Sequence, residues 1–299
     1  MINDFKKIQR NFIIGDEWLY LKIYTGYKTS DKIIRETIAP LVEYLFKEKL
    51  IDRWFFIRYT DPKYHLRIRI HIVDKSKLSD VLLIFNSAIR QYLEDDLISK
   101  VQADTYQREI ERYGTTSMEL SEEIFCIDST AIINLIKNLH GTETENTRWL
   151  ITMKMIDALL TNFELNLEQK CELLKTMQEN FGKEFGFTKD NRKQFGVKYR
   201  KHKIEIDGIM NNNILSEYDN IITEKSKKLK PIAKSILSLK ENNILEIDLS
   251  NMLSSYIHMM LNRAFRTNQR KYELVIYDFL YNYYKSQIAR QGKSLKTEV

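Results

Sequence analysis

The stretch HLRIRIHIV, residues 65–73, decides the fold of the first third of the chain. Successive side chains of a strand point to opposite faces, so this stretch has one apolar face and one polar face. The apolar face carries Leu66, Ile68, Ile70 and Ile72, and the polar face carries His65, Arg67, Arg69 and His71. The apolar face predicts packing on a core. For the polar face, a solvated outer surface is the ordinary interpretation, and a covered binding surface is the alternative.

Strands and helices are predicted to alternate around this stretch. Apolar alternation predicts strands at 17–25 and 53–60, and an extended segment at 98–109. Helical periodicity predicts helices from about 31 to 50 and from 77 to 93. The order strand-helix-strand-strand-helix-strand is that of the split βαβ unit of ferredoxin-like domains. Both helices of such a unit cover the same face of the sheet, which leaves the other face open.

From about residue 121 onward the pattern is helical. Helices are predicted at 129–140, 146–163, 167–181, 246–265 and 269–289, and YRKHKIEIDGI (199–209) is a candidate strand. We therefore expect an α+β protein with a ferredoxin-like part at 1–120 and a largely helical part at 121–299. The helical part is expected to pack on the open sheet face, so that both form one catalytic unit. The polar row would then be covered, where charges are costly unless they bind something.

The composition indicates a packed globular protein. The 299 residues are 43% hydrophobic and 29% charged, and 47 Lys and Arg against 41 Asp and Glu give a net charge of +6. The sequence has no zinc-finger spacing, aromatic RNA-binding signature or long basic run, so we expect no direct contact with nucleic acid. We expect a cytoplasmic protein, because no signal peptide or membrane-length apolar run is present and its two cysteines carry no pairing pattern.

No cofactor or metal motif is present. The sequence lacks a Walker loop, a dinucleotide glycine fingerprint, a nucleophile elbow and a His-Glu-x-x-His pair. We expect neither cofactor nor metal, and any chemistry must use arginine, histidine, glutamate and tyrosine.

Two polar stretches accompany the strand at 65–73. In YQREIERYG (106–114), an extended chain puts Glu109, Glu111 and Tyr113 on one face, whereas a helical turn makes Glu109 and Arg112 neighbours. A surface ion-pair cluster is the ordinary interpretation of this stretch. In YIHMMLNRAF (256–265), a helix aligns His258 and Asn262 on one apolar face. A buried asparagine needs a hydrogen-bonding partner, and so does a buried histidine.

A family resemblance rests on three motifs. WFFIRYTDPKYHLRIRI (54–70), YQREIERYG followed by EEIFCIDS (122–129), and HMMLNR (258–263) occur in this order. Together they resemble the carboxy-terminal domain of class I lanthipeptide dehydratases. The same domain also occurs as stand-alone thiopeptide-type bacteriocin biosynthesis proteins. The resemblance covers nearly the whole chain.

The resemblance implies a lyase that acts in lantibiotic or related peptide biosynthesis. In such dehydratases an amino-terminal domain transfers glutamate from glutamyl-tRNA to Ser or Thr of a precursor peptide. The carboxy-terminal domain then eliminates the glutamate and leaves dehydroalanine or dehydrobutyrine. Because the chain is too short for the first domain, we expect the elimination half of a split enzyme. Its expected partners are a precursor peptide with a leader and a separate glutamylating subunit, and a homodimer is left open.

Motif by motif, the resemblance implies five catalytic residues: Arg67, Arg69, Glu109, Arg112 and His258. Arg67 and Arg69 would bind the glutamyl carboxylates and the enolate, with Arg112 in support. His258 would be the proton donor or the base, and Glu109 would orient an arginine or compete as base. We also predict three substrate-binding residues: His65, Tyr113 and Asn262.

Two alternatives stay open. A divergent branch of the family, the pyridine synthases, performs a formal [4+2] cycloaddition between dehydroalanines and releases the leader. That branch departs from the eliminating set of Arg, Glu and His, which appears complete here. The second alternative is a non-catalytic scaffold that binds the precursor peptide or a dehydratase subunit, with the arginines making ion pairs only.

Overall fold

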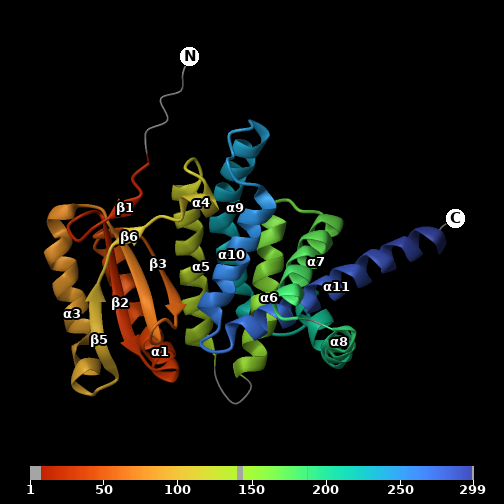
Figure 1. Cartoon of the computed structure of the whole chain (residues 1–299), viewed down its shortest axis with the longest axis horizontal. Coiled ribbons are helices and arrows are strands. Elements are labelled where there is room, and N and C mark those ends of the chain that lie inside the picture. The colour runs from red at the N-terminus through yellow and green to blue at the C-terminus, as the bar shows by residue number, and fades with distance from the viewer. Residues whose placement is uncertain (1–7, 140–143, 187, 298–299) are drawn as a thin grey trace. The chain divides into compact units, whose positions relative to one another are not determined.

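The fold is α+β, as predicted, and the chain divides into two compact units. The computed structural model describes residues 8–139, 144–186 and 188–297 (Figure 1). The first unit comprises Met1–Lys137 and Ser238–Met252, and the second comprises Asn138–Leu237 and Leu253–Val299. The division thus falls at 137 instead of the expected 120, because helix α5 (Met118–Asn138) packs on the sheet. Helices α9 (Asp219–Glu241) and α10 (Leu249–Ala264) contribute residues to both units.

The first unit is built on an antiparallel sheet of four strands in the order β3-β4-β2-β5. The strands are β2 (Trp18–Thr25), β3 (Ile51–Tyr59), β4 (His65–Ile72) and β5 (Ile98–Ala103). Strands β4 and β2 lie in the centre, and β3 and β5 form the edges. This is the strand order of the split βαβ unit, so the ferredoxin-like prediction is confirmed.

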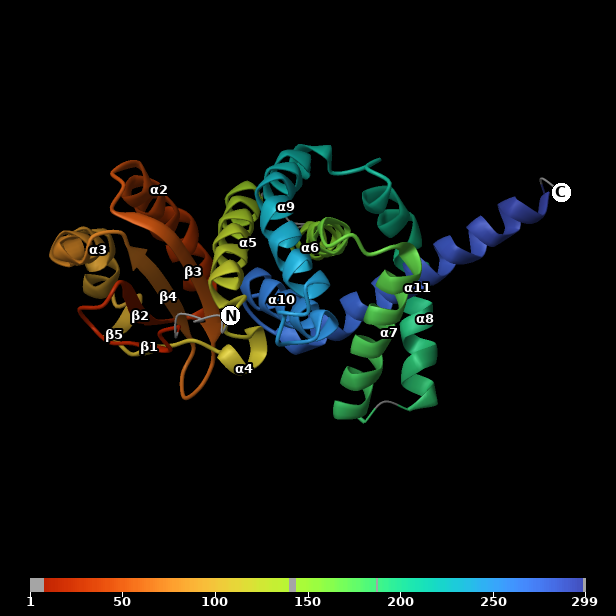
Figure 2. The same ribbon diagram turned by 90° about the horizontal axis from the view of Figure 1, so that it is seen from above.

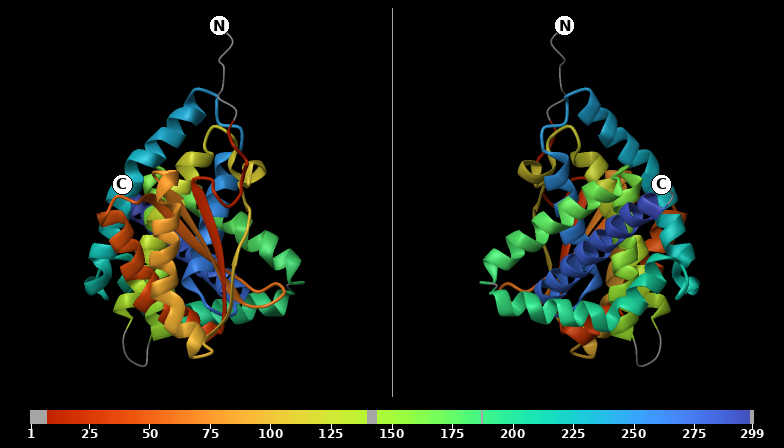
Figure 3. Two further views of the ribbon diagram at one scale, coloured as in Figure 1. Left: turned by 90° about the vertical axis from the view of Figure 1, so that its left-hand side faces the viewer. Right: turned by 90° about the vertical axis from the view of Figure 1, so that its right-hand side faces the viewer.

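Three helices cover the apolar face of this sheet (Figure 1 and Figure 3, left). They are α1 (Tyr27–Ile33), α2 (Ala39–Lys47), which follows a π-helical turn at Ile34–Ile38, and α3 (Leu78–Glu94), which follows a 3-10 turn at Lys75–Lys77. Opposite Ile68 of β4 lies Leu21 of β2, and Ile68, Ile33 and Val81 are at most 1% exposed. The hydrophobic core of the unit therefore lies between the sheet and these helices.

Elements of the same unit cover part of the polar face. The short strand β1 (Asn11–Phe12) pairs with β6 (Tyr106–Gln107), and the Tyr106 ring centroid lies 5.3 Å from that of Trp18. From helix α5, Phe125 contacts Phe55 with ring centroids 5.2 Å apart. A single helical turn, α4 (Ile110–Tyr113), joins β6 to α5. The polar row of β4 is thus covered at one end, which agrees with the alternative interpretation of its strand pattern and not with a fully solvated face.

The described part of the second unit is helical (Figure 2). Its further helices are α6 (Thr144–Asn162), α7 (Leu167–Glu184), α8 (Lys189–Met210) and α11 (Gln269–Thr297), with a 3-10 turn at Ser216–Tyr218. Helix α7 packs along α11, where the Phe181 and Tyr277 ring centroids lie 5.3 Å apart. None of the described helices combines the length and the apolarity that a membrane crossing requires.

One expectation for this unit is wrong. The candidate strand at 199–209 lies within helix α8. Its buried residues Tyr199, Ile206 and Ile209 recur at helical spacing, whereas Ile204, which the strand pattern would have placed beside Ile206, is 88% exposed. The alternation of charged and apolar residues in YRKHKIEIDGI is therefore a local pattern that the helical stripe overrides.

Candidate active site

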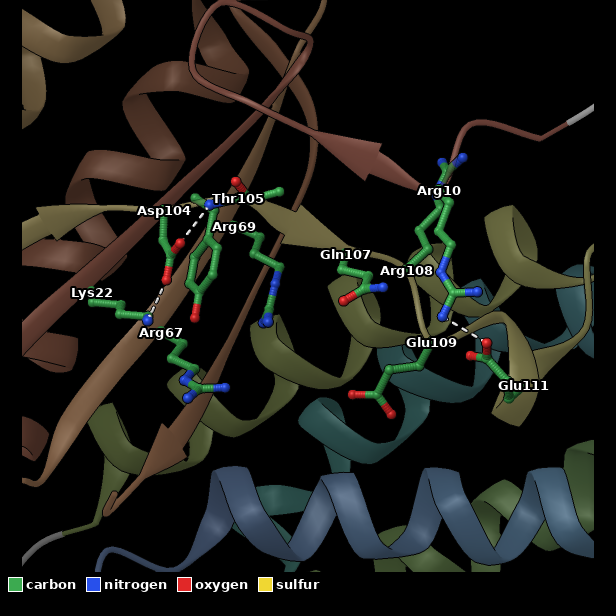
Figure 4. A pocket seen from close by; sticks show the side chains of 11 residues that line it. Arg10, Lys22, Arg67, Arg69, Asp104, Thr105, Gln107, Arg108, Glu109 and Glu111 are labelled. Atoms are coloured by element: carbon green, nitrogen blue, oxygen red, sulfur yellow. Dashed lines mark hydrogen bonds and ion pairs between the residues drawn. The ribbon is translucent and has the colours of Figure 1, made fainter. Parts of the chain in front are cut away.

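A pocket of about 420 Å³ lies on the polar face of the sheet, within the first unit (Figure 4). Strand β4 contributes two arginines and β2 contributes a tyrosine and a lysine, while the chain from the end of β5 to the start of α4 forms the opposite side. The lining residues are Arg10, Tyr20, Lys22, Arg67, Arg69, Asp104, Thr105, Gln107, Arg108, Glu109 and Glu111. Arg67 and Arg69 lie two residues apart on one strand, so the pleat directs both to the same face.

Arg69 is held by aromatic rings instead of carboxylates. The side chain is only 8% exposed, and its guanidinium carbon lies 4.5 Å from the ring centroid of Tyr20, 5.0 Å from that of Tyr106 and 5.2 Å from that of Phe55. Within the described residues, no carboxylate forms an ion pair with Arg69, and its Nε has no hydrogen-bond partner. Burial lowers the pKa of Arg69. An arginine nevertheless stays protonated in proteins, so the cation persists.

Arg67 is positioned by its neighbours on the sheet. Its Nε donates a hydrogen bond to Nε2 of His65 at 3.0 Å, and its guanidinium carbon lies 3.4 Å from the ring centroid of Tyr59. No carboxylate of the described chain lies within ion-pair distance of Arg67. His65 is fully buried behind Arg67 and does not line the pocket, so its expected contact with substrate becomes a contact with Arg67.

The other cations at the pocket are matched by acids. Lys22 forms an ion pair with Asp104, and this contact holds the pKa of the Asp104 carboxyl below its usual range. Arg10 forms an ion pair with Glu111 at 2.6 Å. Arg108 makes a two-pronged pair with the buried Glu122, with both N–O distances at 2.7 Å. The excess positive charge of the pocket therefore comes from the two arginines of β4.

This arrangement can bind an anion. A guanidinium has forked donors that match the two oxygens of a carboxylate, and a partly buried position strengthens the attraction. The cations are fixed in place without being neutralised, because their contacts are rings and an imidazole. Burying charge in this way is costly, so the site is more easily explained by a ligand than by stability alone.

After β6, the stretch 106–114 forms a helical turn, which is one of the two forms expected from its sequence. Glu109 lines the pocket and pairs with Arg112 at 3.0 Å, as the i, i+3 spacing requires, with side chains 58% and 49% exposed. Arg112 is not among the lining residues. Tyr113 was expected to bind substrate, but it is buried against Phe125 with ring centroids 5.0 Å apart. Tyr113 therefore packs against α5 in the interior and does not line the pocket.

His258 and Asn262 belong to helix α10 in the second unit. Nδ1 of His258 lies 2.9 Å from a carboxylate oxygen of Glu273, which is fully buried and is also paired with Arg270 at 3.0 Å. Asn262 donates to Gln269 at 2.8 Å, and Gln269 donates to Glu273. The polar partners that the sequence required for this histidine and asparagine thus come from helix α11. The His258 side chain is 32% exposed, and Glu273 fixes the orientation of its ring.

The residues of these two clusters that the sequence prediction did not include are exemplified by Tyr20, Lys22 and Glu273. Tyr20 and Lys22 lie on β2 opposite Arg69 and Arg67, and only the strand register brings them there. The alternation of apolar and polar residues in WLYLKIYT (18–25) indicated that Tyr20 and Lys22 share the polar face. It did not indicate which strand pairs with β2. Glu273 carried a different signal, because it is an acid at an otherwise apolar position of its helix and is 0% exposed. Among residues 8–139, 144–186 and 188–297, no group of three His, Cys, Asp or Glu is arranged to hold a metal.

The family of the chain follows from a match over most of its length. The family described as "Lantibiotic biosynthesis dehydratase C-term" matches residues 18–284, and the chain belongs to this family. The family is a component of lantibiotic dehydratases, which are enzymes of peptide modification.

Curated relatives are longer proteins of lantibiotic biosynthesis. The nisin biosynthesis protein NisB of Lactococcus lactis subsp. lactis is 34% identical over 134 residues, which are 44% of this chain and 13% of NisB. The subtilin biosynthesis protein SpaB of Bacillus subtilis is 28% identical over 57% of this chain and 17% of its own. The epidermin biosynthesis protein EpiB of Staphylococcus epidermidis is 23% identical over 91% of this chain and 26% of its own. The chain therefore spans about a quarter or less of these relatives.

Solved structures share the fold. The tRNA-dependent lantibiotic dehydratase MibB of Microbispora sp. 107891 matches 94% of this chain and 29% of its own, with a TM-score of 0.69 and 19% identity. TbtD, a pyridine synthase from thiomuracin biosynthesis, matches 90% of this chain and 99% of its own, with a TM-score of 0.66 and 12% identity. One fold is thus found both as part of a dehydratase and as a separate synthase.

Proposed function

We propose that the chain eliminates glutamate from glutamylated Ser or Thr residues of a ribosomally synthesised precursor peptide. The products are dehydroalanine or dehydrobutyrine and free glutamate. The observation that supports this reaction most strongly is the pair of guanidiniums on β4 that line a pocket without carboxylate partners. Glutamate brings two carboxyl groups to the reaction, and such cations are suited to bind them.

The reaction needs a base and a place for negative charge. The base takes the Cα proton of the glutamylated residue, the Cα–Cβ double bond forms, and the Cβ–O ester bond breaks. Glutamate leaves with the electron pair of that bond as a carboxylate, and negative charge also develops on the amide oxygen next to Cα. Fixed cations near these oxygens lower the barrier, and the loss of one such donor typically costs about 10²–10³ in rate.

The residue roles follow from these needs. Arg69 and Arg67 are assigned to the carboxylate and the developing oxyanion, while Glu109 and Arg112 adjust the charge at the rim of the pocket. His258 is assigned to proton transfer, since Glu273 accepts from its Nδ1 and leaves Nε2 for the substrate. A carboxylate leaving group needs no proton at neutral pH, so we favour His258 as the base.

The proposal includes a partner. A separate, glutamyl-tRNA-dependent subunit supplies the glutamylated peptide, and the leader of that peptide directs it to both proteins. Because aminoacyl-tRNA is a cytoplasmic substrate, the reaction is assigned to the cytoplasm.

The direct test is a defined substrate. The purified chain is incubated with precursor peptide that a class I glutamylating enzyme has glutamylated, and the products are analysed by mass spectrometry. Loss of one glutamate from each modified residue, with free glutamate released, is the expected result. Glutamylated peptide that persists unchanged, under conditions where a known dehydratase converts it, would overturn the proposal.

A pyridine synthase is the alternative function. Its supporting observation is that TbtD, a separate protein, matches the chain over 99% of its own length. A peptide that already contains dehydroalanines distinguishes the two. Formation of a macrocycle with release of the leader would favour cycloaddition, whereas an unchanged dehydrated peptide favours elimination.

A further inference from the structure

His65 connects the backbone of the chain to one of the two pocket arginines. The side chain is buried, with 0% exposure. Its Nδ1 lies 2.8 Å from the carbonyl oxygen of Lys63, and its Nε2 lies 3.0 Å from Nε of Arg67. The imidazole also stacks on Tyr24 at a centroid distance of 4.6 Å. The ring is therefore held by the Lys63 carbonyl and the Tyr24 ring, and its third contact is the arginine.

These partners determine the protonation state of His65. A carbonyl oxygen can only accept, so Nδ1 carries the hydrogen. Nε of Arg67 can only donate, so Nε2 must carry a lone pair. His65 is therefore the neutral imidazole with its proton on Nδ1, and a proton on Nε2 would set two donors against each other.

We propose that His65 is a positioning residue, whose neutral imidazole holds Arg67 in the orientation that binds the anionic group of the substrate. This inference rests on the proposed function. The hydrogen bond fixes Nε, and the Tyr59 ring supports the flat guanidinium, so the two Nη groups remain for the ligand. A carboxylate in the place of His65 would hold Arg67 equally well but would neutralise it. A neutral acceptor keeps the charge available.

The charged groups around the ring agree with a neutral His65. Arg67 on β4 and Lys22 on β2 disfavour the imidazolium, while the Lys63 carbonyl and Asp61, in the turn before β4, favour it. Tyr24 and Tyr59, from β2 and β3, add neutral rings. Burial, and then Arg67, lower the pKa of His65 below its usual value of 6.5.

Two variants separate positioning from packing. His65→Leu keeps an apolar side chain against Tyr24 but has no acceptor, while His65→Gln can accept from Arg67 and donate to the Lys63 carbonyl. His71→Gln is the matched control, because His71 lies on the same face of β4 but outside the pocket lining. In single-turnover elimination on glutamylated peptide, His65→Leu is expected to be slower by about 10–100-fold, which corresponds to losing a hydrogen bond to a charged group.

His65→Gln is expected to recover most of that rate, and His71→Gln to behave like the unmodified chain. A His65→Leu rate equal to that of the unmodified chain would overturn the proposal. A folded His65→Gln that is no faster than His65→Leu would do the same. Near-ultraviolet circular dichroism checks that each variant is folded.

A spectroscopic measurement on the unmodified chain does not depend on activity. Two-bond ¹⁵N–¹H spectra of ¹⁵N-histidine-labelled protein report the tautomer of each imidazole. At pH 7 we expect the Nδ1–H tautomer for His65. The signals of His65 are assigned as those that are missing from the spectrum of His65→Gln. An Nε2–H tautomer or an imidazolium at pH 7 would overturn the proposal. If the chain eliminates nothing, the proposed function fails, and the spectrum still decides whether His65 holds Arg67 as described.

Discussion

At the scale of residues, the chain holds its buried arginines in two different ways. Arg58 and Arg108 are paired with buried carboxylates and serve the framework. Arg67 and Arg69 are instead held by rings and by a neutral imidazole. A carboxylate partner satisfies an arginine, whereas a neutral partner orients it and leaves its charge for a ligand. The difference in partners separates the pocket arginines from the structural ones.

The buried carboxylate of Glu122 gives a stability prediction. It is fully buried, pairs with Arg108 through both oxygens and accepts from the Tyr106 hydroxyl at 2.8 Å. Glu122→Ala removes both short ion-pair contacts of the buried Arg108 guanidinium and is expected to lower the free energy of unfolding by about 3–5 kcal/mol. Urea denaturation measures the change. Glu119→Ala is the control, because Glu119 is 65% exposed and lies 3.6 Å from the same arginine, so an equal loss from both would contradict this account.

The buried imidazole of His65 gives a pH prediction. Its pKa in the folded chain is lower than 6.5, so the unfolded chain binds the proton more readily. The stability that depends on neutral His65 is thus fully present above about pH 6.5 and is lost as the pH falls toward the lower, folded pKa. We expect His65→Gln to lose less stability than the unmodified chain over this interval. Unfolding curves at several pH values test it, and parallel losses in both proteins would count against it.

At the scale of elements, the sheet could be predicted from the sequence and much of the site could not. Strands β2, β3 and β4 begin and end within about two residues of the predicted segments, since alternation of apolar residues reports which face is buried. The extended segment predicted at 98–109 divides into β5 and β6, and β1 was not predicted. Helix α5 begins at Met118 instead of 129, because its buried face includes the polar residues Ser121, Glu122 and Asp128, which interrupt the apolar period. Periodicity thus located the strands better than this helix.

The site required information that no local pattern contains. The alternation in β4 predicted that Arg67 and Arg69 share a face, and the structure confirms this. The partners of these arginines come from β2, β3 and β6, and only strand order and register decide which residues face them. For this reason the aromatic surroundings of Arg67 and Arg69 were not predicted. The helical turn at Ile110–Tyr113 was one of two open interpretations of its stretch.

The outer edge of β3 gives a prediction at this scale. The backbone N–H of Phe56 donates to the hydroxyl of Ser129 on α5 at 3.2 Å, and Ser129 is fully buried. Ser129→Ala leaves this buried N–H without an acceptor and should lower the free energy of unfolding by about 1–3 kcal/mol. Ser87→Ala is the control, because Ser87 bonds a carbonyl of its own helix and is exposed. Equal unfolding midpoints for Ser129→Ala and the unmodified chain would show that α5 does not support this edge.

At the scale of the whole molecule, the chain carries the family fold but covers only part of the longer relatives. It matches 29% of MibB and 13% of NisB. The reaction proposed here begins with a peptide that is already glutamylated, so glutamylation must come before it. The pocket agrees with this order, since its unmatched cations suit a carboxylate that arrives on the substrate.

The proposed requirement for a separate glutamylating subunit can be tested in cells. We expect precursor peptide expressed with this chain alone to stay unmodified. Expression with a glutamylating subunit alone should yield glutamylated peptide, and only the three together should yield dehydrated peptide, as seen by mass spectrometry. Dehydration by the chain and precursor alone would show that activation does not need a separate protein.

The most direct measurement addresses the unpaired cation of Arg69. Arg69→Met keeps much of the side-chain volume among the aromatic rings but removes the guanidinium. Arg90→Met, on the exposed surface of α3, removes a guanidinium paired with Glu94 and serves as the control. The rate of glutamate loss from glutamylated peptide is predicted to fall about 10²–10³-fold in Arg69→Met and to be unchanged in Arg90→Met. Equal rates for Arg69→Met and the unmodified chain would contradict the assignment of this pocket as the site of elimination.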